Sequence, residues 1–272
     1  MVDSSRSTRS WLATATVALT AALLFAPALQ AAEEEHVESG HGEASHSVDW
    51  HSWKAGNEVA NTASLQRGAT HFVNYCIGCH SLKYMRYSRM AKDLDITDEQ
   101  LRDNLILTGA KPTDYMLSTF PAADAVTWFG RPPPDLSLIT RAKSADYVYQ
   151  FLKTFYVDES KPTRSNNLAL DGAAMPAVLS DLEGVKRAVF STEGSAEHAG
   201  GKMLERFEQV SPGALKAEEY DAFVRDVVNF LDYAGDPSQV VRQSIGIWVV
   251  LFLLVFTWFA WLLKREYWKD VH

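Results

Sequence analysis

The sequence predicts an all-α fold with long loop insertions and one C-terminal transmembrane helix. Apolar residues recur at helical spacing in two widely separated segments, Leu65–Cys76 and Tyr220–Leu231. A third segment, Ser244–Leu263, is apolar on every face and contains no charged residue. No segment alternates polar and apolar residues persuasively, so neither a sheet nor an internal repeat is expected.

The chain begins with the features of an export signal. Arg6 and Arg9 precede the apolar run Trp11–Phe25, and small residues predominate at positions 26–32. This order predicts a cleaved signal peptide over residues 1–32. A retained N-terminal anchor is disfavoured, because the run is short for a membrane span and acidic residues follow it directly.

A polar segment, residues 33–57, follows the signal peptide. Its histidines are spaced five residues apart, at His36, His41, His46 and His51. Five residues is not a helical repeat, so these side chains do not share one helix face. We therefore favour a solvated linker over a metal-binding tail.

The run Cys76-Ile77-Gly78-Cys79-His80 contains the only two cysteines of the chain. Each vinyl group of haem c takes a thioether bond from one thiol, and two intervening residues let both thiols reach from one helical turn. The adjacent His80 is then placed to bind the iron as an axial ligand. The spacing predicts one covalently attached haem c. A thioredoxin-like redox pair would need a preceding strand, and a zinc site would need two more ligands at matched spacing.

Two short helices are expected after the haem motif, one on each side of the stretch Lys111–Pro134. Thr97 begins the first with a capping-box pattern that includes Gln100, and Gly109 suits its C-terminal cap. Ser144 is placed to cap the second, whose apolar residues run as far as Phe155.

Two proline- and glycine-containing stretches are expected to be irregular: Lys111–Pro134 and Lys161–Ala177. Later, the helix of Tyr220–Leu231 is ended by Gly235 and Pro237. This helix and the one before the haem motif would cross beside the haem. The pattern predicts an all-α cytochrome c-type haem domain over residues 58–243, with long loop insertions.

Ser244–Leu263 is long enough for a transmembrane helix, because about 20 residues at about 1.5 Å each span about 30 Å. Lys264, Arg265 and Lys269 follow it, which places residues 264–272 in the cytoplasm by the positive-inside rule. The haem domain is then expected in the periplasm, anchored by one helix (residues 244–263) to a bacterial inner membrane.

The chain is acidic, with 26 Lys and Arg against 34 Asp and Glu and a formal net charge of −8. A field of this sign repels nucleic acid and attracts a basic protein partner. The alternative is that the charge only keeps an exported domain soluble.

A sixth iron ligand is expected beside His80, because iron held on both faces mainly transfers electrons. Met175 is favoured, since small residues before it (Gly172, Ala173, Ala174) allow close approach to a porphyrin. A thioether ligand raises the reduction potential relative to a second histidine. The other candidates are Met85, Met90, Met116, Met203, His71 and His198.

Several motifs occur together and in one order along the chain. They are Ser64-Leu65-Gln66-Arg67-Gly68 and His80-Ser81-Leu82-Lys83-Tyr84 around the haem motif, then Asp114-Tyr115, Phe120-Pro121, Pro133-Pro134-Asp135-Leu136-Ser137, Arg141-Ala142-Lys143, Asp146-Tyr147-Val148 and Met175-Pro176. With the C-terminal anchor, they make the chain resemble the cytochrome c1 family, the c-type cytochromes of the quinol:cytochrome c oxidoreductase (bc1) complex. The resemblance covers roughly Ala60–Lys264.

The resemblance implies single-electron transfer from a Rieske iron–sulfur protein to a soluble or tethered cytochrome c. This chain would then be the electron-transfer subunit of a reductase, with no substrate chemistry of its own, in contact with cytochrome b inside a dimeric complex. The resemblance supports Met175 as the second axial ligand. It places Tyr147 and one basic residue, Arg141 or Lys143, at the haem propionates, and Pro133 and Pro134 against the haem.

Two other functions fit the haem motif. One is a different membrane-tethered electron-carrier cytochrome that serves a terminal oxidase or reductase, which the proline-flanked motif and the C-terminal anchor disfavour. The other is a haem enzyme or gas sensor with an open iron site, which predicts fast carbon monoxide binding by the reduced protein.

Overall fold

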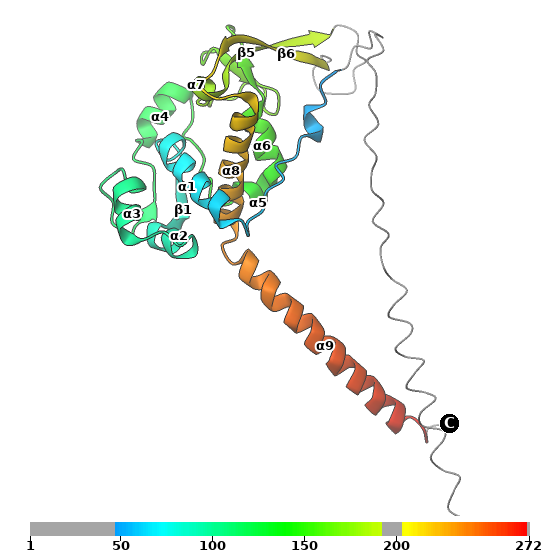
Figure 1. Cartoon of the computed structure of the whole chain (residues 1–272). Coiled ribbons are helices and arrows are strands. Elements are labelled where there is room, and N and C mark those ends of the chain that lie inside the picture. The colour runs from blue at the N-terminus through cyan, green and yellow to red at the C-terminus, as the bar shows by residue number, and fades with distance from the viewer. Residues whose placement is uncertain (1–46, 192–202, 271–272) are drawn as a thin grey trace, which may run out of the picture. The chain divides into compact units, whose positions relative to one another are not determined.

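The computed structural model describes residues 47–191 and 203–270, and this part of the chain is mainly helical, as predicted (Figure 1). The signal peptide, His36, His41 and His46 lie outside the described residues. The helices are the 3₁₀ turn η1 (Trp50–Ser52), α1 (Thr62–Tyr75), α2 (Tyr87–Asp93), α3 (Asp98–Asn104), α4 (Ala122–Phe129), α5 (Ile139–Lys143), α6 (Ala145–Lys153), α7 (Ser180–Glu183), α8 (Ala217–Gly235) and α9 (Gln239–Tyr267).

The expectation of no sheet is wrong, because the described residues form three small antiparallel sheets. The pairs are β1 (Leu82–Arg86) with β2 (Tyr115–Met116), β3 (Phe155–Val157) with β4 (Ser165–Asn167), and β5 (Gly184–Ser191) with β6 (Met203–Pro212). Most of these strands are too short to show an alternation. The longest pair changes register between Val185 and Lys186 and again between Val189 and Phe190, which breaks the two-residue period.

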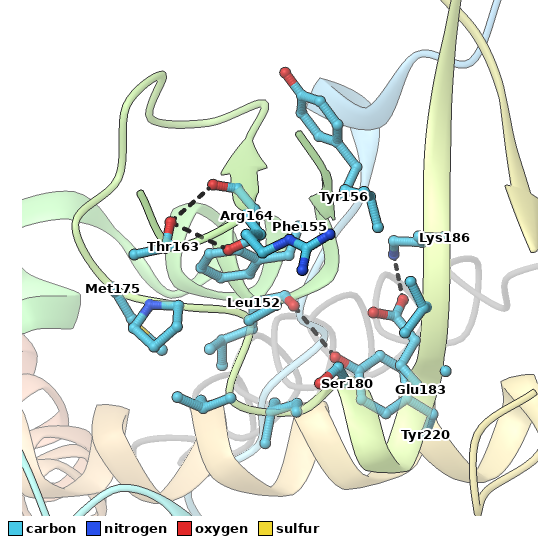
Figure 2. A pocket seen from close by; sticks show the side chains of 18 residues that line it. Leu152, Phe155, Tyr156, Thr163, Arg164, Met175, Ser180, Glu183, Lys186 and Tyr220 are labelled. Carbon is cyan, nitrogen blue, oxygen red and sulfur yellow. Dashed lines mark hydrogen bonds and ion pairs between the residues drawn. The ribbon is translucent and has the colours of Figure 1, made fainter. Parts of the chain in front are cut away.

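Strands β3 and β5 and helix α7 lie around one cavity (Figure 2). Tyr156 of β3 and Phe190 of β5 contact each other edge to face, with ring centroids 5.8 Å apart. The second stretch, Lys161–Ala177, is irregular as expected except for β4, and both of its ends, near Ser165 and Met175, line this cavity.

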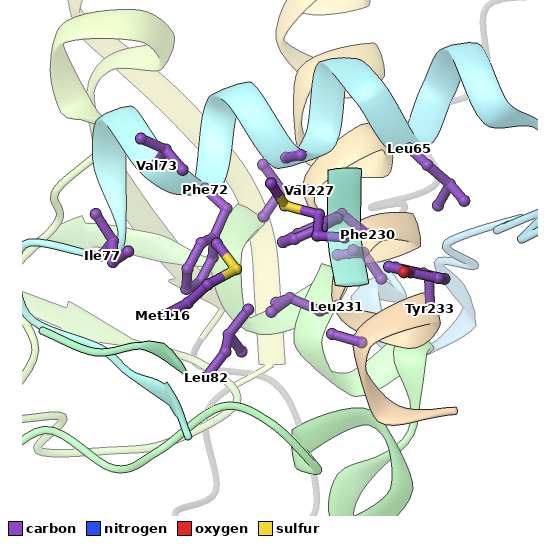
Figure 3. Close-up of a cluster of buried hydrophobic side chains, with 14 of the residues drawn as sticks. Leu65, Phe72, Val73, Ile77, Leu82, Met116, Val227, Phe230, Leu231 and Tyr233 are labelled. Atoms are coloured by element: carbon purple, nitrogen blue, oxygen red, sulfur yellow. The ribbon is translucent and has the colours of Figure 1, made fainter. Parts of the chain in front are cut away.

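The hydrophobic core lies where α1 crosses α8, as expected from the two periodic segments (Figure 3). Phe72 of α1 and Phe230 of α8 are fully buried, and their ring centroids lie 5.7 Å apart. The helices approach closely at Gly68, since a Cβ atom there would lie 2.0 Å from the Asp226 carbonyl oxygen. Only glycine fits this crossing point without moving a helix.

A buried polar network ties the same two helices together. Asp226 of α8 accepts hydrogen bonds from Arg67 Nε at 2.6 Å and from Ser64 Oγ at 2.6 Å. Asn229 Nδ2 donates to Ser64 Oγ at 3.0 Å. These hydrogen bonds fix the rotation of α1 against α8, although Asn229 Oδ1 is buried without a hydrogen-bond partner in the described structure.

Asp221 joins α8 to α6. Its carboxylate accepts hydrogen bonds from Lys153 Nζ, Tyr149 Oη and, at 2.7 Å, Arg225 Nε. Burial raises the pKa of Asp221, but these donors and the charge of Lys153 outweigh burial and lower it to about 2. Arg225 Nη1 also donates to the Ala55 carbonyl, which fastens the segment before α1 to the domain.

The helix boundaries test the capping predictions. The capping box of Thr97 and Gln100 is confirmed, with both reciprocal hydrogen bonds at 3.0 and 3.2 Å. The proposed cap at Gly109 is wrong, because α3 already ends at Asn104. Ser144 caps α6 as expected, accepting from Tyr147 N at 3.2 Å. That helix ends at Lys153, and the following Phe155 lies in β3.

The stretch Lys111–Pro134 is more ordered than the sequence suggested, because it holds β2 and α4. α4 begins after Pro121, whose fixed φ suits a helix start, and ends at Phe129, which is followed by Gly130 in a left-handed conformation. The prolines therefore lie on either side of a short helix, where the sequence predicted a continuous loop.

The predicted apolar helix is present as α9 and extends beyond Ser244–Leu263 at both ends. It is long and apolar enough to cross a membrane, and its most apolar window has no buried residue in the described structure. Lys264 and Arg265 lie in its last turn.

Candidate haem site

The haem motif begins where α1 ends. Cys76 is the C-terminal cap of α1, and its carbonyl accepts from Cys79 N at 3.0 Å and from His80 N at 2.8 Å. Both thiols are free, with Cys76 half-buried and Cys79 exposed. Burial, with a smaller contribution from Cys79, raises the pKa of the Cys76 thiol to about 12. One turn thus presents the two thiols and His80 together.

The His80 ring is oriented by a backbone carbonyl. Its Nδ1 atom lies 2.8 Å from the Pro134 carbonyl oxygen. A carbonyl only accepts hydrogen bonds, so Nδ1 carries the proton and Nε2 keeps its lone pair for a metal. Burial lowers the pKa of His80 more than this hydrogen bond and Asp135 raise it, which keeps the imidazole neutral.

The segment Pro133–Ser137 braces the residues that follow His80. Asp135 Oδ2 accepts from Lys83 N at 2.9 Å, and Ser137 Oγ accepts from Tyr84 N at 3.2 Å. Leu136 N donates to the Ser81 carbonyl at 2.9 Å. The motif and this proline-flanked segment therefore form one unit, although 54 residues separate His80 from Pro134.

Ser118 provides a second brace that the sequence did not indicate. Its hydroxyl donates to the Gly78 carbonyl at 2.9 Å, and its backbone N–H donates to Ser81 Oγ at 2.9 Å. Both contacts lie on the haem motif or next to it. A serine in a loop carries no spacing signal, so only the structure identifies it.

Among the candidate sixth ligands, three methionines are core residues. Met85, Met90 and Met116 are at most 2% exposed and belong to the hydrophobic cluster. His71 stacks on Phe223 of α8, with ring centroids 4.0 Å apart. Two alternatives remain: His198 lies outside the described residues, and the structure describes only the backbone of Met203.

Met175 is half-buried and lines the cavity of about 330 Å³ bordered by β3, α7 and β5 (Figure 2). Gly172, three residues earlier, has φ +68°, a turn conformation suited to glycine. Glu183 and Lys186, an ion pair, line another part of the cavity. Cys76, Cys79 and His80 are not among the lining residues, so the cavity adjoins Met175 and not the motif.

The two basic residues considered for the haem propionates have different surroundings. Arg141 lies 3.4 Å from Asp236 and donates to Gln239 Oε1 at 3.1 Å. Lys143 is exposed, and its Nζ lies 5.6 Å from the centroid of the Tyr147 ring. Of the two, only Lys143 has no carboxylate partner in the described structure.

The residues present fit a haem c. The motif offers two thiols at the required spacing and an imidazole whose Nε2 is free. Met175 is a half-buried thioether on a cavity that the motif does not line. Pro133 is half-buried and Pro134 holds His80. When bound, haem would supply an iron that gains or loses one electron, and Pro134 would keep the His80 ring in its orientation.

A mainly helical domain whose first long helix runs into such a motif belongs to the class of c-type haem proteins. The family model described as the Cytochrome C1 family matches residues 51–271. A cytochrome c1 from Allochromatium vinosum is 49% identical over 222 residues, 82% of this chain and 90% of that protein. A protein named ammonia monooxygenase gamma subunit, from Nitrosomonas europaea, is 42% identical over 219 residues, 80% and 88% of the two chains. A cytochrome c1 from Rhodospirillum rubrum is 26% identical over 254 residues, 83% and 88%.

The chain belongs to the cytochrome c1 family. Membership of this family supports a c-type cytochrome of the bc1 complex and implies haem c as the cofactor. The resemblance drawn from the motifs is thereby confirmed.

Proposed function

We propose that this chain takes single electrons from a Rieske iron–sulfur protein and passes them to a soluble or tethered cytochrome c. The observation that carries the proposal is the hydrogen bond from His80 Nδ1 to the Pro134 carbonyl, which leaves Nε2 free for the iron. The proline-flanked motif of the family supplies that carbonyl. Each transfer moves one electron, with no bond made or broken on this subunit.

The proposed haem site has Cys76 and Cys79 as thioether attachments and His80 and Met175 as axial ligands. The core positions of Met85, Met90 and Met116 support Met175 by removing its nearest rivals. Two ligands on the iron leave no open position for a small molecule, which favours electron transfer over a gas sensor or a haem enzyme.

Lys143 is the proposed partner of the haem propionates, together with Tyr147. The support is that Arg141 already pairs with Asp236, whereas Lys143 is exposed beside the Tyr147 ring. Lysine binds a carboxylate as a point charge, without the two-pronged geometry of arginine. Pro133 and Pro134 are the proposed packing contacts on the His80 side.

We further propose the topology expected from the sequence. Residues 1–32 are a cleaved signal peptide, residues 33–57 a polar segment and residues 58–243 the periplasmic haem domain. Residues 244–263 span a bacterial inner membrane, and residues 264–272 are cytoplasmic. The support is the length and apolar composition of α9 and the basic residues in its last turn.

The axial ligand is tested by near-infrared absorption of the oxidised protein. Met175→Leu should abolish the methionine-to-iron band and lower the reduction potential. Met116→Leu is the matched control, because it exchanges a fully buried core methionine for a residue of similar volume and should keep the band. A band that survives Met175→Leu would refute the assignment.

The partners are tested by purifying the intact assembly in mild detergent. Cytochrome b and a Rieske protein should copurify with this chain, and quinol should reduce its haem. The relative named as an ammonia monooxygenase subunit raises a second candidate, an electron-transfer subunit of an oxygenase. Copurification with oxygenase subunits in place of cytochrome b would favour that candidate.

A further inference from the structure

Two adjacent asparagines, Asn166 and Asn167, are buried on β4, just before the loop that leads to Met175. They are 3% and 1% exposed. β4 pairs with β3 in a fixed register, so both side chains start from hydrogen-bonded backbone. A buried amide is costly unless its polar atoms have hydrogen-bond partners. The partners of these two side chains therefore show what the pair holds in place.

The Asn167 side chain organises the start of the loop. Its Oδ1 accepts from Ala169 N at 2.9 Å, from Leu170 N at 3.2 Å and from Thr154 Oγ1 at 3.2 Å. Its Nδ2 donates to the Phe151 carbonyl of α6 at 2.7 Å. One side chain thus joins the first turn of the loop to α6 and to the residue before β3.

The Asn166 side chain organises the later part of the loop. Its Oδ1 accepts from Gly172 N at 2.9 Å and from Asn167 N at 2.8 Å. Its Nδ2 donates to Asp171 Oδ1 at 2.7 Å and to Asp158 Oδ2 at 3.1 Å. Carboxylates only accept and backbone N–H groups only donate, so the orientation of this amide is fixed. Both of its hydrogens and both lone pairs of its oxygen are used.

Gly172 connects these hydrogen bonds to the proposed iron ligand. It lies three residues before Met175 and turns the chain with φ +68°. The next residue, Ala173, is 6% exposed and donates from its backbone N–H to the Leu170 carbonyl at 3.2 Å. The two asparagines therefore set where the loop turns, and few backbone torsions remain between that turn and Met175.

Packing does not hold Met175 on its cavity side. Met175 lines the cavity of about 330 Å³ that β3, α7 and β5 border (Figure 2). Empty space beside a side chain removes the contacts that would otherwise fix it. The restraint on that side must therefore come from the backbone of the loop, which the asparagine side chains hold.

We infer that Asn166 and Asn167 are positioning residues that keep the Met175 thioether on the haem iron in both oxidation states. The inference rests on the proposed axial ligand and adds to it what holds that ligand in place. Groups that orient a metal ligand typically contribute about 10–100-fold to metal affinity or activity. A ligand held in this way keeps the iron closed to small molecules through repeated single-electron transfers.

The experiment uses the haem-loaded full chain in its assembled complex, with Asn167→Ala and Asn166→Asp. Aspartate is nearly isosteric and still accepts from Gly172 N, but it loses both donors and sets a third carboxylate beside Asp158 and Asp171. Both variants should weaken the near-infrared methionine-to-iron band. The reduced variants should bind carbon monoxide at least about tenfold faster, because carbon monoxide binds only after the thioether has left the iron.

Asn229→Ala is the matched control. Asn229 is 2% exposed, and its Nδ2 donates to Ser64 Oγ at 3.0 Å and to the Glu58 carbonyl at 2.9 Å. These partners belong to α1 and the segment before it, away from the Met175 loop. The control should lower Tm about as much as the other two variants. It should leave the band and the rate of carbon monoxide binding within about twofold of the unmodified protein.

Met175→Leu separates failure of the inference from failure of the proposed ligand. If it abolishes the band while both asparagine variants keep the band and the carbon monoxide rate, the inference alone is overturned. If the band survives Met175→Leu, the proposed ligand fails, and the inference fails with it. Equal loosening by Asn229→Ala would mean that general destabilisation frees the ligand, which also overturns the inference. If an asparagine variant does not accumulate with haem, Asn167→Ser decides by the same measurements, since its hydroxyl still accepts a hydrogen bond.

Discussion

Replacing Gly68 by alanine should destabilise the haem domain, although alanine is the better helix former. A Cβ atom at position 68 would lie 2.0 Å from the Asp226 carbonyl oxygen and 2.7 Å from Phe230 Cβ. Both obstacles belong to α8 close to its backbone, so neither can swing away as a flexible side chain would. Relief requires that α1 and α8 separate by about 1 Å, since packed carbon and oxygen atoms lie about 3 Å or more apart.

The size of the effect follows from two opposing contributions. Overpacking of a tight core costs about 1–3 kcal/mol, and a backbone clash lies at the upper end. The higher helix propensity of alanine returns about 1 kcal/mol. The expected net loss is about 2 kcal/mol, which for a domain of this size lowers Tm by about 4–8 °C.

The assay is thermal unfolding of the purified haem-loaded protein in detergent, followed by circular dichroism and by haem absorption. Thr70→Ala is the control, because Thr70 is exposed on the same helix. Its Tm should stay within about 2 °C of the unmodified protein. An unchanged or higher Tm for Gly68→Ala would refute the close approach of the two helices.

Three further predictions concern charge and capping. The folded-state pKa of Asp221, about 2, lies below the ordinary value of about 3.9, so its contribution is present above pH 4 and is lost as pH falls toward 2. Asp221→Asn should cost about 2 kcal/mol at pH 7 and flatten the pH dependence of denaturant unfolding between pH 4 and 2. Thr97→Ala should destabilise α3 by about 1 kcal/mol, seen as faster amide hydrogen exchange confined to that helix. Lys143→Gln should lower the haem midpoint potential by about 40 mV, equivalent to about 1 kcal/mol for one electron, whereas Arg141→Gln should leave it nearly unchanged in a redox titration.

The parts of the fold that the sequence predicted well are those set by local order. α1, α8 and α9 each have an apolar pattern over several turns. Such a pattern indicates a helix whatever the tertiary contacts of that helix are. The caps at Thr97 and Ser144 depend on residues within the same turn. The haem motif is likewise local, because five consecutive residues define it.

The parts that the sequence missed depend on contacts between distant segments. β1 and β2 pair although α2 and α3 lie between them in the sequence, and β2 has only two residues, Tyr115 and Met116. No pattern in two residues distinguishes a strand from a loop. The sequence also did not predict the buried ion pair of Glu183 and Lys186, because charged residues are expected on the surface.

The candidate site also has a part that local sequence predicts and a part that depends on contacts between distant segments. The two thiols and the axial ligand His80 were predictable, since all three belong to one motif of five consecutive residues. Choosing among the methionines required knowing which ones are buried, and Met85, Met90 and Met116 are core residues only because the chain folds around them. Likewise, the choice between Arg141 and Lys143 depends on Asp236, almost a hundred residues away.

The two braces of the haem motif connect ligand geometry to the outer surface. Pro134 orients His80, and Ser118 holds Gly78, and these two residues are also the ends of the segment that carries α4. A loop fixed at both ends has few conformations left, so its exposed side chains keep their positions without a large core beneath them. The hydrogen bonds that orient the proposed iron ligand therefore also hold the segment that carries Trp128 against the haem motif. One short segment thus sets both the orientation of His80 and the positions of the exposed side chains Val126 and Trp128.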